Sequence, residues 1–325
     1  MSARLPVPRT PDPRTAPVAR WGILAPGGIA RGFATALREG TGQEIVAVGS
    51  RTVERAKAFA DEYGVTAAYG SYAEVVNHPD VDIVYVASPH SEHHAQARLA
   101  LEAGKPVLVE KAFTRNAAEA RDLVELARAK GLFLLEAMWS RFLPHYDVIR
   151  QVLADGILGE VTTVFADHGQ QLYPNGPERL SRPELAGGAL LDLGVYPLSF
   201  ADFVLGPFAS VTATGALTDL GVDSQETICV TTAGGAQGVL HASMLARSGC
   251  SASICGTAGR LDIDGTFYAP TRIRLVDRSG ECSTSAAPPR TRRDTACGTR
   301  RPRPHAGWPL VTPSRPCSPS PTRCG

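Results

Sequence analysis

The sequence predicts an α/β protein of two domains, with a doubly wound parallel sheet in the N-terminal half and a mostly antiparallel, open sheet in the C-terminal half. Apolar strands alternate with helical patterns from residue 21 to residue 136, which is the order of repeated βαβ units. From residue 211 onward, short alternating strands follow one another, which is typical of an antiparallel sheet. A chain of 325 residues is long enough for two domains.

The composition is that of an ordinary globular protein, at 43% hydrophobic and 20% charged residues. The net charge of +1 hides an acidic body, because residues 21–280 carry 21 basic and 29 acidic residues, a net charge of −8. Such a body offers no electrostatic footprint for nucleic acid, so no nucleic-acid partner is expected. No run approaches the roughly 18 apolar residues of a membrane span, so no membrane partner is expected either.

Residues 1–19 are rich in proline and arginine and lack the apolar stretch of a secretory signal, so we expect a disordered leader. Of the seven cysteines, Cys229, Cys250 and Cys255 lie in the predicted domains and show neither metal-ligand nor redox spacing. We therefore expect no metal site and a reducing, cytoplasmic setting.

The first predicted strand, residues 21–25, runs into Gly27, Gly28 and Ile29 and then into a helical pattern through residue 38. Glycines let the backbone approach a pyrophosphate, and the N-terminus of the helix supplies free N–H groups. Alanines occupy the outer positions of the G-x-G-x-x-G pattern, so a plain tight turn remains the alternative to a nucleotide site.

The second predicted strand, residues 43–50, ends at Ser50 and Arg51. In a dinucleotide-binding fold an acid at this point binds the ribose 2′-hydroxyl of NAD, whereas an arginine accommodates the 2′-phosphate of NADP. The pair Ser50-Arg51 contains no acid, so the sequence favours NADP, with NAD as the alternative cofactor. An arginine that merely opens the next helix is the other interpretation.

Two further strands end in polar residues, at the edge where open α/β sheets bind ligands. Residues 83–87 lead to Ser88 and His90, and residues 106–109 lead to Glu110 and Lys111. A short apolar run that stops at charge suits a buried parallel strand. Lys111 should therefore point into a cleft, the alternative being a solvated Glu-Lys pair.

The neighbouring His93 and His94 open the helix that we predict over residues 92–103. Adjacent residues point about 100° apart on a helix, so these two side chains cannot share a metal ion by local spacing. We interpret them as polar residues of the helix N-terminus.

A helix over 116–130 and a strand over 132–136 complete the first domain, which we place at residues 20–138. The second domain is predicted over residues 139–280. It contains helices at 144–154 and 190–203, a polar loop at 169–186, and strands at 161–168, 211–217, 227–232, 238–245, 252–255, 260–263 and 273–277.

Five blocks, in this order and spacing, resemble the glucose-fructose oxidoreductase/inositol dehydrogenase (Gfo/Idh/MocA) family, and most of all its branch of dihydrodiol and NADP-dependent sugar dehydrogenases. The blocks are residues 22–30, 88–93, 110–111, 136–144 and 187–196. The resemblance implies an N-terminal Rossmann domain, a C-terminal α/β domain with an open sheet, a nicotinamide cofactor, and subunits that pair into homodimers. It also implies oxidation of a secondary or hemiacetal hydroxyl on a carbohydrate or cyclic diol.

The same resemblance implies a catalytic lysine at Lys111, substrate-side residues at Asp192 and Tyr196, and cofactor contacts at Trp139 and Arg141. The proline that usually follows the family's Glu-Lys pair is replaced here by Ala112. Because proline fixes the backbone, this departure loosens the expected placement of the lysine.

The chemistry calls for these side chains independently of the family. Hydride leaves a carbinol carbon only as the hydroxyl proton is taken, and a tyrosine of pKa about 10 is a poor base at neutral pH unless a cation lowers its pKa. We hypothesise that Lys111 and Tyr196 share the proton transfer while Asp192 orients the substrate. Which of the two accepts the proton stays open. The alternative is a helix N-terminal acid and a core tyrosine.

Residues 281–325 contain nine prolines and eight arginines and no periodic apolar pattern. We expect them to be disordered, and we hypothesise an aberrant terminus produced by a reading-frame artefact or a truncated gene, with a functional basic arm as the rival. A catalytically inactive, nucleotide-binding protein of regulatory or truncated character is therefore the alternative to an active dehydrogenase.

Overall fold

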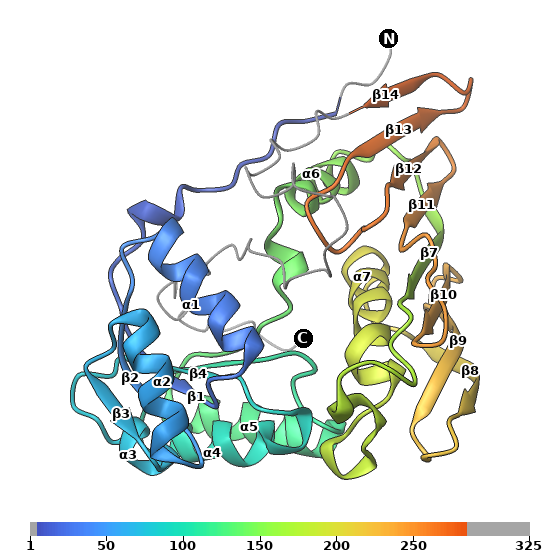
Figure 1. Cartoon of the computed structure of the whole chain (residues 1–325). Coiled ribbons are helices and arrows are strands. Elements are labelled where there is room, and N and C mark those ends of the chain that lie inside the picture. The colour runs from blue at the N-terminus through green and yellow to red at the C-terminus, as the bar shows by residue number, and fades with distance from the viewer. Residues whose placement is uncertain (1–4, 285–325) are drawn as a thin grey trace, which may run out of the picture.

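The computed structural model describes residues 5–284, which form two sheets with helices between and around them (Figure 1). The first, sheet A, has the strand order β3-β2-β1-β4-β5-β6, and every pairing in it is parallel. The second, sheet B, has the order β14-β13-β12-β11-β7-β10-β9-β8. All of its pairings are antiparallel except that of β7 with β10. The predicted fold class is confirmed.

Sheet A is buried on both faces, as a parallel sheet requires. Helices α1 and α2 share one apolar core with the sheet, and α3, α4 and α5 share the other. The strands are β1 (Arg20–Leu24), β2 (Glu44–Gly49), β3 (Ala67–Tyr69), β4 (Ile83–Val86), β5 (Val107–Val109) and β6 (Leu134–Glu136). The helices are α1 (Gly28–Gly40), α2 (Val53–Tyr63), α3 (Tyr72–Val76), α4 (His93–Glu102) and α5 (Ala117–Lys130).

Sheet B packs one face on α6 (Pro144–Ala154) and α7 (Val195–Leu205), which together form the core of the second domain. Its other face is open, with Phe165 47% and Val239 37% exposed. The strands are β7 (Val161–Gly169), β8 (Ser210–Leu217), β9 (Asp223–Thr231), β10 (Gln237–Ser243), β11 (Ala252–Gly256), β12 (Gly259–Ile263), β13 (Ile273–Asp277) and β14 (Cys282–Thr284).

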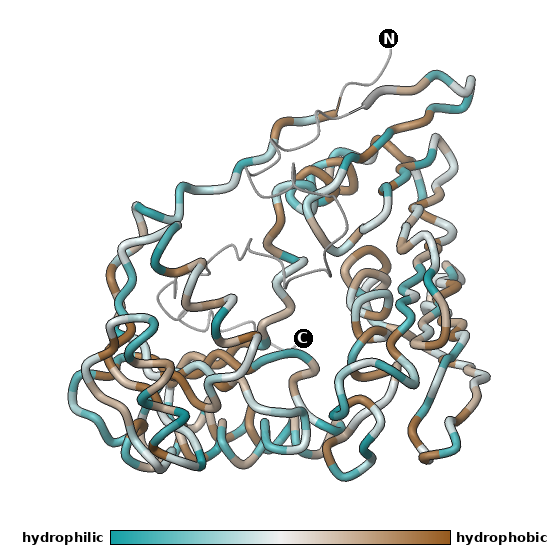
Figure 2. Tube along the Cα trace, viewed as in Figure 1, coloured by the Kyte–Doolittle hydropathy of each residue, from teal (hydrophilic) through white to brown (hydrophobic). Residues whose placement is uncertain are grey.

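The expectation that no segment has the length and apolarity of a membrane span needs a correction. Residues Pro183–Leu205 pass such a test by length and composition, mainly because α7 is predominantly apolar (Figure 2). Half of that window is buried inside the protein, and α7 packs against β7 and β10. The burial of α7 accounts for its apolar sequence as that of a core helix.

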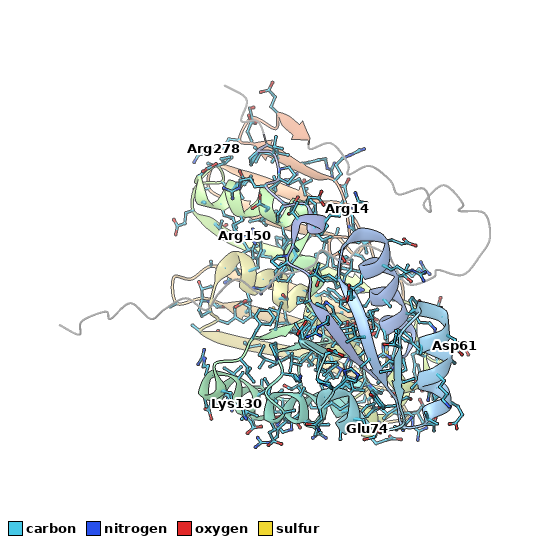
Figure 3. All side chains as sticks on the ribbon, turned by 90° about the vertical axis from the view of Figure 1, so that its left-hand side faces the viewer. Arg14, Asp61, Glu74, Lys130, Arg150 and Arg278 are labelled. Atoms are coloured by element: carbon cyan, nitrogen blue, oxygen red, sulfur yellow. The ribbon has the colours of Figure 1, made fainter. Side chains whose placement is uncertain are left out.

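The leader also differs from expectation, since its residues 5–19 hold defined contacts. The backbone N–H and guanidinium of Arg9 donate to Asp147 of α6 at 2.8 to 3.3 Å, and Gln151 donates to the carbonyl of Val7 at 3.0 Å. A short 3₁₀ turn, Pro13–Thr15, follows. The leader thus runs from α6 to β1, as Figure 3 shows with Arg14 and Arg150 labelled.

Residues 282–284, which the sequence placed in a disordered tail, form a strand. Strand β14 (Cys282–Thr284) pairs antiparallel with β13 and extends sheet B by one strand. The remaining part of the expected tail, 285–325, lies outside the described residues.

Candidate active site

The turn after β1 presents an uncapped helix N-terminus at the carboxyl edge of sheet A. Helix α1 begins at Gly28, its N-cap Gly27 makes no side-chain capping bond, and Ile29 is 38% exposed. A Cβ placed on Gly28 would meet no atom within 4 Å. Free N–H groups facing open space are what a pyrophosphate needs, so the turn fits that anion.

Polar side chains at the ends of β2 and β4, the two strands that flank β1, also suit a nucleotide. Ser50 is buried at the end of β2, and Arg51 beside it is exposed and forms no ion pair with any residue that the structure describes. At the end of β4 the hydroxyl of Ser88 is buried and has no hydrogen-bond partner among the described residues. A buried orphan hydroxyl next to the glycine turn marks a place where a bound molecule would supply the missing partner.

The predicted lysine and aspartate, from different domains, form a buried ion pair. Lys111 follows β5, and its Nζ donates to the carboxylate of Asp192 at 3.1 Å and to the Asp192 carbonyl oxygen at 2.8 Å. Arg179, which the sequence did not single out, donates to the same Oδ1 atom of Asp192 at 3.0 Å. One carboxylate therefore holds two cations at the domain junction.

These contacts set the charges of the cluster. Burial disfavours the carboxylate of Asp192, but Lys111 and Arg179 outweigh it and hold the Asp192 pKa well below its usual value. Burial likewise works against the ammonium of Lys111, yet the negative charge of Asp192 raises the Lys111 pKa above its usual value. The ion pair is thus fully charged at neutral pH.

Tyr196 completes the constellation that the resemblance implies. Lys111 Nζ lies 5.0 Å from the centre of its ring, and its hydroxyl accepts a hydrogen bond from Trp139 Nε1 at 3.1 Å. Burial raises the pKa of Tyr196 in spite of the nearby ammonium. The expected lowering by the lysine is therefore present but outweighed by burial, so the phenol keeps its proton at neutral pH.

Glu110, the residue before the lysine, is buried beneath the site. Its carboxyl accepts hydrogen bonds from the hydroxyl of Tyr85 at 2.5 Å and from the backbone N–H of Lys111 at 3.1 Å. Burial raises the pKa of Glu110 to about 7. These two hydrogen bonds fix the backbone that carries the lysine. The Lys111–Ala112 peptide bond is cis.

Two histidines of the first domain that lie beside the site bind backbone carbonyls. His90 Nδ1 donates to the carbonyl of Ala186 at 3.0 Å and so joins the first domain to the 169–186 loop. His93 is fully buried, with Nδ1 2.7 Å from the Ala112 oxygen and Nε2 2.9 Å from the Ser88 oxygen. The view of His93 as a mere helix-end residue is too simple, since it ties the end of β4 to the residue after the lysine.

Arg141, for which the resemblance implies a cofactor contact, bonds to the C-terminal domain. Its guanidinium donates to the hydroxyl and carbonyl of Ser199 at 2.8 and 2.7 Å and to Asp202 at 2.7 Å. Both partners belong to α7. Its hydrogen-bonding groups therefore brace the helix that carries Tyr196, and its contact with a cofactor stays a prediction.

The structure adds three polar residues beside Tyr196 that the sequence did not reveal. His168 at the end of β7 lies 5.1 Å from the Tyr196 ring and 4.0 Å from the Tyr268 ring. Gln170 donates to His168 Nε2 at 2.8 Å and to the Tyr268 hydroxyl at 3.3 Å. Only the position of His168 at a strand end could have singled it out, and that signal is weak for a mostly antiparallel sheet.

Comparison with known proteins identifies the two domains. The Gfo/Idh/MocA model described as "Oxidoreductase family, NAD-binding Rossmann fold" matches residues 19–138. The model of the GFO/IDH/MocA C-terminal domain matches residues 146–262.

Two curated relatives share most of the chain. Trans-1,2-dihydrobenzene-1,2-diol dehydrogenase from Bos taurus is 38% identical over 273 residues, which are 83% of this chain and 81% of the relative. The protein of the same name from Homo sapiens is 36% identical over 258 residues, 78% of this chain and 77% of the relative.

Solved structures show the same architecture. The 3-ketoreductase KijD10 from Actinomadura kijaniata, in complex with NADP and TDP-benzene, is 29% identical with a TM-score of 0.73, covering 84% of this chain and 85% of that one. The aldose-aldose oxidoreductase from Caulobacter crescentus, complexed with glycerol, is 26% identical with a TM-score of 0.76 and 85% coverage of both chains. On these matches to both domains, the chain belongs to the Gfo/Idh/MocA family of oxidoreductases.

Proposed function

We propose that this protein is an NADP-dependent dehydrogenase that oxidises a secondary or hemiacetal hydroxyl of a sugar or a trans-diol. The observation that carries the proposal is the meeting of Lys111, Asp192 and Tyr196 at the domain junction. The names of the relatives support the substrate class, since they include a diol dehydrogenase and a sugar oxidoreductase.

The cofactor would lie along the carboxyl edge of sheet A. Gly27, Gly28 and Ile29 would hold the pyrophosphate, Ser88 would supply a hydroxyl contact, and Arg51 would bind the 2′-phosphate that distinguishes NADP from NAD. A nicotinamide bound there supplies the hydride acceptor. KijD10, whose structure contains NADP, supports this choice.

The side chains of this chain then divide the work. Asp192 keeps the ammonium of Lys111 in place, and Trp139 fixes the Tyr196 hydroxyl. In the free protein both Lys111 and Tyr196 hold their protons at neutral pH, because both pKa values are raised. The pair must lose one proton before it can take the hydroxyl proton of a substrate, so oxidation should accelerate as the pH rises.

The test is NADP⁺ reduction with a panel of aldoses and trans-diols, repeated with NAD⁺. Lys111→Met and Tyr196→Phe should each lower kcat by about 100-fold or more, because each removes a member of the proton-transfer pair. NADP affinity, measured by quenching of protein fluorescence, should stay within about threefold of the parent. Near-normal turnover in both variants would overturn the assignment.

The inactive alternative has its own outcome in the same experiment. A nucleotide-binding protein without catalysis would bind NADP and reduce it with no member of the panel. The charged Lys111–Asp192 pair and the adjacent phenol favour catalysis over that alternative.

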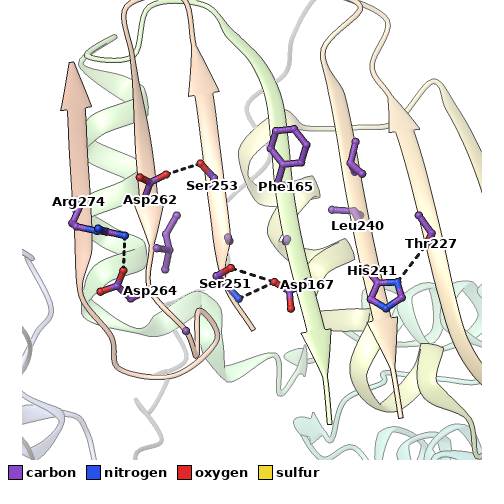
Figure 4. A pocket seen from close by; sticks show the side chains of 15 residues that line it. Phe165, Asp167, Thr227, Leu240, His241, Ser251, Ser253, Asp262, Asp264 and Arg274 are labelled. Atoms are coloured by element: carbon purple, nitrogen blue, oxygen red, sulfur yellow. Dashed lines mark hydrogen bonds and ion pairs between the residues drawn. The ribbon is translucent and has the colours of Figure 1, made fainter. Parts of the chain in front are cut away.

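We also propose that the open face of sheet B mediates a homodimer. Figure 4 shows Phe165 and Asp167 on β7, with His241 of β10 and Ser253 of β11 on the neighbouring strands. Phe165 is 47% exposed at the centre of the sheet. A mixed apolar and hydrogen-bonding face that residues 5–284 leave uncovered has the surface composition of a subunit interface.

A further inference from the structure

The polar loop before the active-site helix brings an arginine into the catalytic cluster. Arg179 lies in the short turn Glu178–Ser181, far in sequence from Lys111. Its Nη2 atom and Lys111 Nζ contact the same carboxylate oxygen of Asp192, at 3.0 and 3.1 Å. The two cationic nitrogens therefore lie within about 6 Å of each other, a distance at which like charges interact strongly in a buried site.

The loop is held firmly enough to make this contact specific. The backbone N–H of Gly188 donates to the carbonyl of Leu180 at 3.0 Å, which anchors the turn against the segment leading to Asp192. On the other side, His90 binds the carbonyl of Ala186 at 3.0 Å. Arg179 is thus fixed between two anchors, one in each domain.

A second arginine of the same loop provides a contrast. Arg182 forms ion pairs with Glu178 and Glu184, both exposed. Among the described residues, Arg179 has its one ion pair with Asp192, a side chain only 10% exposed. The two arginines, three positions apart, therefore have different partners. Arg182 pairs with acids on the surface of the loop, and Arg179 pairs with the buried carboxylate of Asp192.

We propose that Arg179 is a positioning residue of this site. It holds the carboxylate of Asp192 and weakens the stabilisation that this carboxylate gives to the protonated form of Lys111. With one oxygen shared between two cations, the ammonium has less than a full counter-charge. The positive charge of Arg179 also repels the ammonium, an effect that lowers the Lys111 pKa. The importance of this for turnover rests on the proposed function, whereas the effect on Lys111 itself does not.

Other charged and titratable groups face Lys111, and they are the same in the parent protein and in a variant at position 179. They are Asp192, Tyr196, Glu110, Glu136, His90, His93 and His168. Since a substitution at position 179 leaves all of them in place, a change in the reactivity of Lys111 reports on Arg179.

The first test measures that reactivity without any substrate or cofactor. The chain contains four lysines, Lys57, Lys105, Lys111 and Lys130, so acetylation by acetic anhydride at pH 8 can be followed at each by peptide mass spectrometry. Arg179→Met should slow the acetylation of Lys111 by about tenfold relative to the exposed Lys57, which corresponds to a rise of about one pH unit in its pKa. Arg179→Lys should stay near the parent rate.

Control variants separate the charge effect of Arg179 from an effect on folding or on access of the reagent. Arg182→Met should leave the Lys111 rate unchanged, and Arg179→Gln repeats the test with a polar side chain in case the methionine variant does not fold. If Arg179 merely shielded Lys111 from the reagent, its removal would speed the labelling. An unchanged or faster rate would overturn the proposal.

The second test is kinetic and applies once a substrate is found. In Arg179→Met the rising limb of kcat/KM against pH should move upward by about one pH unit, and NADP affinity should not change. A lower kcat with an unmoved limb would contradict the charge effect. If no substrate is turned over, the proposed function fails while the labelling still decides the role of Arg179.

Discussion

Glu226 of β9 is a buried carboxyl outside the Lys111–Asp192–Tyr196 cluster. Its two carboxyl oxygens are buried without a hydrogen-bond partner among the described residues. Burial, together with the nearby charge of Asp223, raises the pKa of Glu226 to about 8. Its carboxyl packs against the turn that carries Asp192, because a Cβ at Gly194 would lie 2.7 Å from its Oε1 atom.

This carboxyl should make stability fall as the pH rises. Between the unfolded pKa near 4.5 and the folded pKa of about 8, the folded state holds a proton that the unfolded state has lost, so each step upward in pH favours unfolding. Glu226→Gln should remove up to about 1.4 kcal/mol per pH unit of that slope. The measurement is urea unfolding from pH 5 to pH 9.

The control for this slope is Glu54→Gln, a substitution on the exposed side of α2. It should leave the pH dependence of stability as it is in the parent. Parallel curves for the parent and Glu226→Gln would show that the buried carboxyl does not titrate in this window.

At the scale of elements, the segment before α7 departs from the predicted continuous helix over 190–203. Leu190–Gly194 forms a π turn, and α7 starts at Val195. Asp192 and Tyr196 therefore belong to different elements, although both still contact Lys111. A π turn inserted into a helix is frequent at functional sites, since it re-aims the side chains that it carries.

Gly188 opens this segment and admits no side chain. Its φ is +117°, and an added Cβ would lie 1.9 Å from Asp223 Oδ1. Gly188→Ala should lower the free energy of unfolding by about 2–4 kcal/mol, through backbone strain and the clash, and should lower kcat by displacing Asp192. Denaturant unfolding and steady-state kinetics measure the two effects.

Gly156 supplies the matched control, because its φ is +65° and a Cβ there would meet nothing within 4 Å. Gly156→Ala should lower the free energy of unfolding by only about 1 kcal/mol, from strain alone. Equal losses at the two glycines would mean that the contact with Asp223 relaxes freely.

At the scale of the whole molecule, the site exists only where the domains meet. Lys111 comes from sheet A, whereas Asp192 and Tyr196 come from the segment that packs on sheet B. The His90–Ala186 hydrogen bond and the Arg9–Asp147 contacts of the leader reinforce the junction. The open face of sheet B points away from it, as Figure 1 shows, so a partner subunit could cover that face without blocking the site.

The dimer proposal predicts that a charged side chain at the centre of this face halves the molecular mass of the particle in solution. Phe165→Glu should convert a dimer into a monomer, because a carboxylate at the centre of the face cannot be desolvated without a partner. Size-exclusion chromatography with light scattering measures the mass. Val18→Glu, at a residue of the leader that is 59% exposed, should leave the dimer intact, and a monomeric parent protein would contradict the proposal.

The sequence by itself determined the order of strands and helices, because hydrophobic periodicity is local and the β-α alternation allows few topologies. It also singled out Lys111, Asp192 and Tyr196 through their motifs. The tertiary structure alone decided which charges share a carboxylate. Arg179 lies in a polar loop with no periodic or motif signal, and no local pattern predicted the bonds of Arg141 to α7, since hydrogen-bond partners of long side chains depend on residues that are distant in the chain. Burial raises the pKa of Tyr196 although the ammonium of Lys111 lowers it. The extent of that burial follows only from the packing of the two domains.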